Sequence, residues 1–324
     1  MSEPIVLDGQ TLHPEMQRLL EIRAKRNILA PRDLPLDELR ALSLRDAVVA
    51  GGDPTPVDDV TDLTVPGPAG PLRARAYAPA RWKNLLVFFH GGAFVLGDLD
   101  SHDTICRLLC AEGGFAVLSV EYRLAPEDRF PAPFDDAWAA WQWTVAEART
   151  LPFAPRAPRL FVGGDSAGGL LAAAVTQLAA RAGSPGPALQ LLLYPAISRD
   201  RDTHSMQLFA DGFFLTRTDI DYFEECLLGD EPDDRTDFRG HPLVGELTGL
   251  PPAYIVTAGF DPLRDGGEAY AAALEVAGVP VTLRRYETFI HGFLNMLGFS
   301  PAARAATVEI AHTTAKLLPP DDMG

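Results

Sequence analysis

One glycine-rich segment carries the strongest chemical signal in this chain. Residues 163–169 have the sequence GGDSAGG and contain the pattern G-x-S-x-G around Ser166. An apolar, strand-like run, Leu160–Val162, precedes the segment and a helical pattern follows it, which is the context of a nucleophile elbow. Such a turn exposes the serine hydroxyl at a helix N-terminus, where negative charge is stabilised. We therefore predict that Ser166 is the nucleophile of an acyl-transfer reaction; a glycine-rich turn with an incidental serine is the alternative.

A second glycine segment could stabilise the charge that such a reaction develops. Residues 90–94 have the sequence HGGAF and follow the apolar run Leu85–Phe89. Acyl transfer requires backbone N–H donors aimed at the tetrahedral oxyanion, and glycines let the backbone approach the substrate closely. The N–H groups of Gly91, Gly92 and Ala167 are the predicted donors of this oxyanion hole.

A histidine and an aspartate follow two later strand-like runs. His291 comes just after the last run, and Asp261 comes just after the one before it. An imidazole, with an ordinary pKa of ~6.5, can take a serine proton near neutral pH and return it to a leaving alcohol. We predict that His291 is this base and that Asp261 orients it, whereas His90 braces the glycine loop. The alternatives are that Asp261 only caps the next helix and that Asp265 takes its role.

The elements that must position these residues alternate between strand and helix. Short, continuous apolar runs of this kind are typical of strands buried on both faces of a parallel sheet. Helical patterns lie between them, so a mostly parallel α/β sheet with helices on both faces is predicted. Each candidate residue follows a strand, at the sheet edge where ligands bind in such folds. The strand-like runs are Leu85–Phe89, Ala116–Val120, Leu160–Val162, Leu189–Leu193, Tyr254–Thr257 and Val281–Tyr286, and the helical patterns are about 101–113, 134–148, 167–182, 263–277 and 301–317.

Two segments interrupt this alternation and are predicted to form a cap over the strand ends. Residues 1–45 have the pattern of two amphipathic helices, and residues 198–248 form an insertion too long for a simple connection. The remaining residues, 46–197 and 249–324, form the predicted catalytic domain. Five apolar residues could line a substrate pocket or belong to the cap core, and the pattern favours neither: Phe94, Phe209, Phe213, Phe214 and Leu215.

Composition excludes several classes of protein. The formal net charge is −16, which disfavours nucleic acids and anionic membranes as partners. No apolar run approaches the ~20 residues needed to span a bilayer, and the N-terminus lacks the pattern of a secretory signal. The three cysteines, Cys106, Cys110 and Cys226, do not suggest a disulfide framework or a metal site. A cytoplasmic location is the resulting expectation.

The motifs taken together resemble the hormone-sensitive lipase family of esterases. The resemblance covers residues 90–291 and includes HGGAFVLGDLDSHD (90–103), VEYRLAPEDRFPAPFDDA (120–137), GGDSAGG (163–169), LLLYP (191–195), GFDPLRD (259–265) and HGF (291–293). It implies the α/β-hydrolase fold with a mostly parallel eight-stranded sheet, a helical cap, no cofactor or metal, and hydrolysis of small-molecule carboxylic esters with short to medium acyl chains. The chain order Ser166, Asp261, His291 is that of this fold. A homodimer is a further implied possibility.

The resemblance also implies supporting roles and leaves rival activities open. Asp165 and Glu121 match family positions that support the nucleophile turn. Ala93 stands where the family often has a third glycine, and Gly266 where it often has a glutamate. An amidase, lactonase or deacetylase would use the same three residues. A non-catalytic ligand receptor on this fold is a further alternative, although the presence of His291 argues against it.

Overall fold

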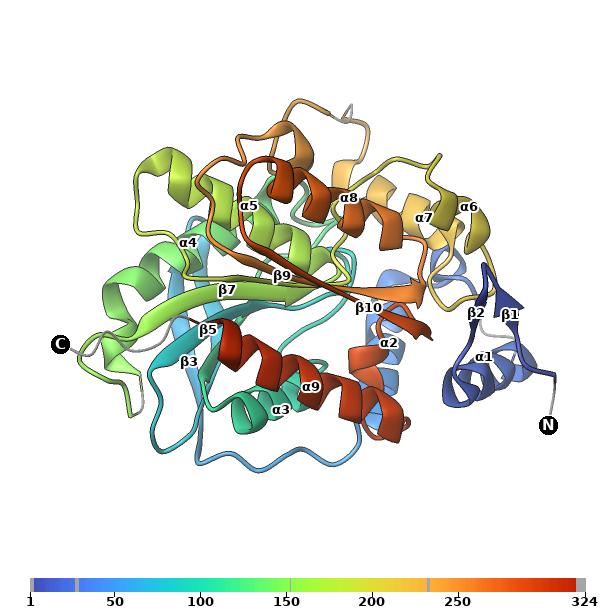
Figure 1. Ribbon diagram of the computed structural model, residues 1–324, viewed down its shortest axis with the longest axis horizontal. Helices are drawn as coiled ribbons and strands as arrows, with labels where there is room; N and C mark the ends of the chain where they lie inside the picture. Colours follow the sequence, from blue (N-terminus) through green and yellow to red (C-terminus); the bar gives the residue numbers. More distant parts are fainter. Residues whose placement is uncertain (1–2, 27–28, 152, 232–233, 319–324) are drawn as a thin grey trace.

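The computed structural model describes residues 3–26, 29–151, 153–231 and 234–318. Its centre is an eight-stranded sheet with the order β10-β9-β8-β7-β5-β6-β4-β3 (Figure 1). The strands from β10 to β6 are parallel, while β4 pairs antiparallel with both β6 and β3. The predicted fold class is confirmed. The strands are β3 (Asp59–Gly67), β4 (Gly70–Ala78), β5 (Asn84–Phe89), β6 (Ala116–Glu121), β7 (Arg159–Asp165), β8 (Gln190–Leu193), β9 (Ala253–Phe260) and β10 (Val281–Ile290).

Helices cover both faces of this sheet and enclose two apolar cores. Because side chains alternate along a strand, Leu85, Val87 and Phe89 of β5 face one core, whereas Leu86 and Phe88 face the other. The helices α4, α5 and α8 lie on the first face, and α3 and α9 lie on the second (Figure 1). Their bounds are α3 (Asp103–Gly113), α4 (Ala132–Glu147), α5 (Ala167–Ala182), α8 (Arg264–Val276) and α9 (Pro301–Leu317).

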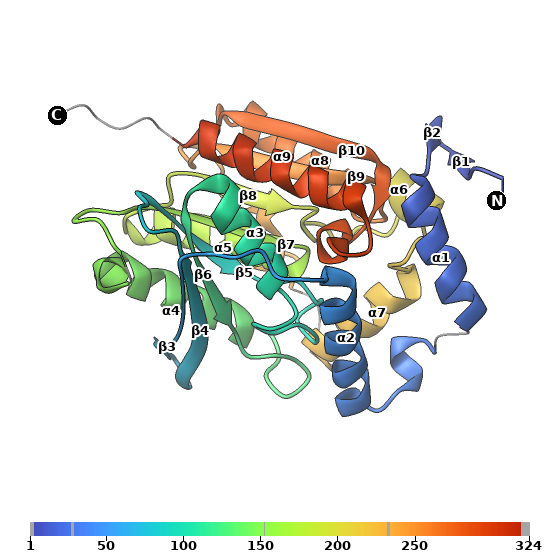
Figure 2. The ribbon, with the colours of Figure 1, turned by 90° about the horizontal axis from the view of Figure 1, so that it is seen from below.

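The two segments outside the alternation lie together beyond the carboxyl ends of the strands. Figure 2 shows α1, α2, α6 and α7 side by side at this end. An ion pair between Arg32 Nη2 and Glu225 Oε2, 3.0 Å apart, joins the N-terminal segment to α7. These elements are α1 (Pro14–Arg26), α2 (Leu36–Gly51), α6 (His204–Leu208) and α7 (Arg217–Leu228), with short 3-10 turns at Pro31–Asp33, Ala148–Thr150, Pro242–Val244 and Phe293–Met296.

The N-terminal segment differs from its sequence pattern in two respects. A two-stranded hairpin, β1 (Val6–Leu7) with β2 (Gln10–Thr11), precedes α1 and lies outside the prediction, although the Asp8-Gly9 pair between its strands is a typical hairpin turn. The predicted boundary at residue 45 falls inside α2, which continues to Gly51. There the backbone packs closely against the catalytic domain, because a Cβ on Gly52 would lie 2.7 Å from Gly298 Cα. No helix in the described ranges is long and apolar enough to cross a bilayer.

Candidate active site

Steric crowding at the turn between β7 and α5 requires its two flanking glycines. Ser166 itself adopts a left-handed backbone conformation, with φ 55°, which is strained for a residue with a side chain. A Cβ on Gly164 or Gly168 would collide with the carbonyl oxygen of Phe89, the last residue of the neighbouring strand β5. The turn is held from the other side by the Ser166 N–H, which donates to the Leu193 carbonyl at 2.9 Å. This geometry explains why the pattern G-x-S-x-G is needed here.

The three residues predicted to act together meet at the carboxyl ends of the strands. His291 Nε2 lies 2.9 Å from Ser166 Oγ, and His291 Nδ1 lies 2.7 Å from Asp261 Oδ2. The Asp261 side chain is fully buried and that of His291 is 8% exposed. Because one imidazole contacts both partners with its two nitrogens, a proton on Nδ1 directed at the carboxylate leaves Nε2 free to accept the serine proton.

Asp261 and Asp265 have different partners, which separates their roles. Besides contacting His291, Asp261 accepts the Leu263 N–H at 2.8 Å on Oδ1, so it also stabilises the turn before α8. One carboxylate, that of Asp261, therefore contacts the histidine and also caps the turn before α8. Asp265 instead accepts the Ser205 N–H at 2.7 Å and the Arg264 Nε–H at 2.9 Å. Asp265 thus binds α6 and is not part of the triad of Ser166, His291 and Asp261.

The loop after β5 does not present the three amides predicted from the sequence. The Gly91 N–H donates to Asp165 Oδ1 at 2.8 Å, so it cannot also be aimed at an oxyanion, and its predicted role does not fit this structure. Among the described residues, the amides of Gly92, Ala93 and Ala167 have no hydrogen-bond acceptor. The candidate oxyanion hole therefore shifts by one residue along the loop. The sequence shows Ala93 only as a substituted glycine, and nothing local indicates that its amide is free.

His90 occupies a bracing position below this loop. Its Nδ1 donates to the Gly91 carbonyl at 2.7 Å, and its ring stacks on Tyr122 with a centroid separation of 4.3 Å. The Tyr122 hydroxyl in turn donates to the His90 carbonyl at 2.7 Å. Burial, helped by the nearby His102, lowers the pKa of His90 to about 4, so the ring is neutral near pH 7. A neutral, fully enclosed ring suits the structural role expected for His90.

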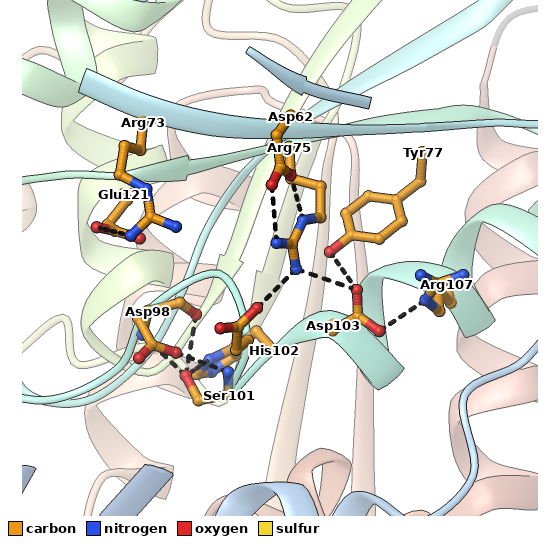
Figure 3. Close-up of polar contacts among 11 residues, drawn as sticks. Asp62, Arg73, Arg75, Tyr77, Asp98, Ser101, His102, Asp103, Arg107 and Glu121 are labelled. Carbon is orange, nitrogen blue, oxygen red and sulfur yellow. Dashed lines mark hydrogen bonds and ion pairs between the residues drawn. The ribbon is translucent and has the colours of Figure 1, made fainter. Parts of the chain in front are cut away.

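Glu121 lies away from the nucleophile turn that it was predicted to support. It pairs with Arg73 at 3.1 Å (Figure 3). Among the described contacts none joins its carboxylate to Ser166 or Asp165. Burial raises the pKa of Glu121, and the neighbouring Arg73 opposes this shift. The predicted support by Glu121 is not seen because β6, which ends at Glu121, lies beside β4 and not beside β7.

The predicted pocket residues divide into cap core and site wall. Phe209 is fully buried and packs with Phe213 and Phe260 at centroid separations of 5.2 and 5.4 Å, so it belongs to the core. Phe213 lies 5.5 Å from the same Phe260 ring. Phe214 instead borders the site, because a Cβ on Gly292, the residue after His291, would lie 3.5 Å from its ring.

Phe94 and Leu215, the two remaining predicted pocket residues, are placed only by their neighbours. A further aromatic residue, Tyr194, lies beside His291. Phe94 is 6% exposed and stacks on Phe134 at 5.4 Å, close to the glycine loop. Leu215 is half-buried beside Phe214. Tyr194, the residue after β8, was not singled out, although its ring lies 4.9 Å from that of His291. Its place directly after a buried strand, like that of the triad residues, was the available signal.

Two cavities lie away from the triad. One of about 560 Å³ is lined by Asp62, Arg75, Asp100 and Asp103, among others. The other, of about 420 Å³, is lined partly by Arg73, Asp98 and Glu121. Within the described ranges, no group of three His, Cys, Asp or Glu side chains is placed to hold a metal ion.

Known proteins resemble the chain over almost its whole length. A family model described as alpha/beta hydrolase fold matches residues 86–295. Carboxylic ester hydrolase LipN of Mycobacterium tuberculosis (strain ATCC 25618 / H37Rv) is 46% identical over 316 residues, covering 94% of this chain and 83% of that protein. The ethyl acetate hydrolase of Pseudomonas putida is 36% identical, covering 88% and 93% of the two chains.

A solved structure agrees with this similarity. The ester hydrolase EH1AB1 from the metagenome of Lake Arreo, in complex with a derivative of bipyridine phosphonate, superposes with a TM-score of 0.89. The two chains are 40% identical, and the match covers 94% of this chain and 98% of that one. By its sequence, its fold and its relatives, the chain belongs to the hormone-sensitive lipase family of esterases within the alpha/beta hydrolase fold.

Proposed function

We propose that this chain is a carboxylesterase that forms an acyl-enzyme on Ser166. Ser166 Oγ attacks the carbonyl carbon of the ester while its proton passes to His291 Nε2. The tetrahedral intermediate collapses, and the alcohol leaves with that proton. Water then attacks the acyl group and gives a proton to His291, which returns it to the serine as the carboxylic acid departs. Asp261 stabilises the imidazolium at each stage.

One observation carries this proposal: the imidazole of His291 contacts the hydroxyl and the carboxylate at once, at 2.9 and 2.7 Å. A nucleophile paired with an oriented base is the arrangement that activates a serine. The amides of Gly92, Ala93 and Ala167 would stabilise the oxyanion. A receptor that only binds its ligand has no need of this complete arrangement.

Small esters are the proposed substrates. The relative named ethyl acetate hydrolase supports a short acyl group, and the aromatic ring of Phe214 beside Gly292 narrows the space next to the base. We expect p-nitrophenyl acetate and butyrate to be hydrolysed faster than the octanoate and laurate. An amide and lactone panel, measured in parallel, separates an esterase from an amidase or lactonase with the same triad.

The decisive experiment labels the nucleophile. A fluorophosphonate probe should modify the wild-type protein at Ser166, identified by mass spectrometry of the peptide, and Ser166→Ala should abolish both labelling and ester turnover. Loss of about 10⁴-fold or more in kcat is expected, since little beyond binding and the oxyanion hole would remain. Labelling at another residue, or turnover retained in Ser166→Ala, would contradict the proposal.

The cap, the homodimer and the cytoplasmic location remain predictions. The segments 1–45 and 198–248, with the rest of α2, are proposed to act together as the cap over the site. A homodimer can be checked by analytical ultracentrifugation, and a cytoplasmic location by cell fractionation.

A further inference from the structure

A buried carboxylate joins the nucleophile turn to the glycine loop. Asp165 directly precedes Ser166, and its Oδ1 accepts the Gly91 N–H at 2.8 Å. The fit is close, since a Cβ on Gly91 would lie 2.5 Å from Oδ2 of the same carboxylate. The orientation of this one side chain therefore decides where residue 91 sits, and with it the two amides that follow.

His102 contacts the same carboxylate oxygen that accepts the Gly91 N–H. Its Nε2 lies 3.3 Å from Asp165 Oδ1, and its side chain is 6% exposed. Its Nδ1 lies 3.0 Å from Ser101 Oγ. The Ser101 hydroxyl donates to the Asp98 carbonyl at 2.9 Å, and the Asp98 N–H donates back to it at 2.8 Å (Figure 3). The ring is thus held by a hydrogen bond at Nδ1, while Nε2 makes no hydrogen bond and faces the carboxylate at ion-pair distance.

The segment that carries His102 is anchored from the sheet edge. Arg75 of β4 contacts Asp100 at 2.8 Å and Asp103 at 3.4 Å, while it also pairs with Asp62 of β3 (Figure 3). The Tyr77 hydroxyl donates to Asp103 at 2.9 Å. These contacts lie on both sides of His102 along the chain, so the segment cannot move away from Asp165 without breaking them.

We propose that His102 is a positioning residue that holds the Asp165 carboxylate and, through the Gly91 amide, sets the oxyanion-hole loop. A hydrogen bond from an amide to an ionised carboxylate is stronger than one to a neutral group. An isolated carboxylate that is fully buried would tend to become protonated. His102 and Gly91 offset that tendency, because burial alone raises the pKa of Asp165 whereas these two neighbours, with His90, bring it below its usual range. Loss of His102 therefore weakens the contact that aligns Gly92 and Ala93.

Two variants of His102 test this inference, which rests on the proposed role of Ser166. In His102→Leu we expect kcat/KM for p-nitrophenyl butyrate to fall about 10²-fold, the lower end of the effect of one lost oxyanion donor. The loss should be in kcat, with KM within about threefold, because the substrate ground state carries no oxyanion. His102→Gln keeps a side-chain N–H that can face Asp165, so it should recover activity to within about tenfold of wild type.

An inhibitor gives a second readout that a purely structural residue would leave unchanged. A trifluoromethyl ketone adds to the serine and forms an oxyanion, so its inhibition constant should rise in His102→Leu by the same factor as kcat/KM falls. His312→Leu is the matched control, since His312 is a half-exposed histidine on α9 that contacts Glu112 at 3.2 Å. It should leave kcat, KM and the inhibition constant unchanged.

The outcomes separate this inference from the proposed function. If the wild-type protein is labelled at Ser166 but a folded His102→Leu keeps kcat/KM within about threefold, only the role of His102 is overturned. If His102→Leu does not fold, the losses in kcat/KM of His102→Gln, Asp165→Asn and their double variant test the inference instead. Losses that are not additive support one shared contact, and additive losses overturn it. Absence of labelling in the wild-type protein would instead contradict the proposed function.

Discussion

The guanidinium of Arg264 lies 3.3 Å from the carboxylate of Asp8, although 256 residues separate the two in the chain. The same buried side chain donates to the Gly259 carbonyl at 3.1 Å and to Asp265 at 2.9 Å. His204 of α6 also contacts Asp8, at 3.3 Å. A single arginine near the triad carboxylate thus joins the N-terminal hairpin to the strand and helix on either side of Asp261.

Removal of this arginine should destabilise the protein. Because Arg264→Met removes a charged donor from the Gly259 carbonyl and leaves Asp265 with the Ser205 N–H alone, we expect the free energy of unfolding to fall by roughly 2–4 kcal/mol. Urea unfolding followed by circular dichroism measures this change. Asp8 is the exposed partner of Arg264, and its replacement should change the free energy of unfolding much less, so Asp8→Asn is the control. Equal effects of the two variants would show that the buried contacts contribute little.

Packing at the nucleophile turn predicts a sharp difference between two glycines. In Gly168→Ala the new methyl group would collide with the Phe89 carbonyl, so we expect a loss of at least about 3 kcal/mol in stability or failure to fold. A Cβ on Gly186 would meet no atom within 4 Å, and Gly186→Ala should be neutral in thermal unfolding. A stable, active Gly168→Ala protein would mean that the turn is looser than described.

Exchange of the triad carboxylate for an amide tests its role directly. Asp261→Asn keeps the size of the side chain but removes the charge and the tautomer preference of His291, so kcat should fall by roughly 10³–10⁴-fold. Asp265→Asn, which alters a carboxylate bound to α6, should reduce thermal stability and change kcat much less. Steady-state kinetics on both variants distinguish the two aspartates. If Asp265→Asn caused the larger loss in kcat, the assignment of Asp261 would be reversed.

The buried His90 predicts that the protein loses stability on acidification. Its pKa is lowered to about 4 in the folded state, whereas an unfolded histidine has a pKa of ~6.5. Between these values the unfolded chain binds more protons, so the free energy of unfolding falls as the pH falls. The contribution of His90 is complete above pH ~6.5 and decreases by at most about 1.4 kcal/mol per pH unit below it.

Urea unfolding between pH 7.5 and 4.5 measures that dependence. In His90→Asn the slope against pH should be smaller than in the wild-type protein, because one titrating group has been removed. His312→Asn changes a half-exposed histidine and should keep the wild-type slope. A wild-type slope in both variants would mean that His90 does not carry the effect.

The sequence by itself determined the features that depend on local chemistry. Continuous apolar runs such as Leu85–Phe89 indicate buried parallel strands, because no other element hides both faces of so short a segment. The glycines around Ser166 indicate a tight turn, since steric exclusion acts between residues adjacent in the chain or in the next strand. Positions directly after strands then bring Ser166, Asp261 and His291 to the same edge of the sheet.

Tertiary structure alone decided which groups contact one another across that edge. Gly91 and Asp165 are 74 residues apart, and nothing near either one shows that the amide is already bound to the carboxylate. The strand order turns Glu121 toward Arg73, and packing against Phe260 makes Phe209 part of the core. Such contacts depend on strand order, register and side-chain direction, which arise only when distant segments pack together, so a local pattern cannot contain them.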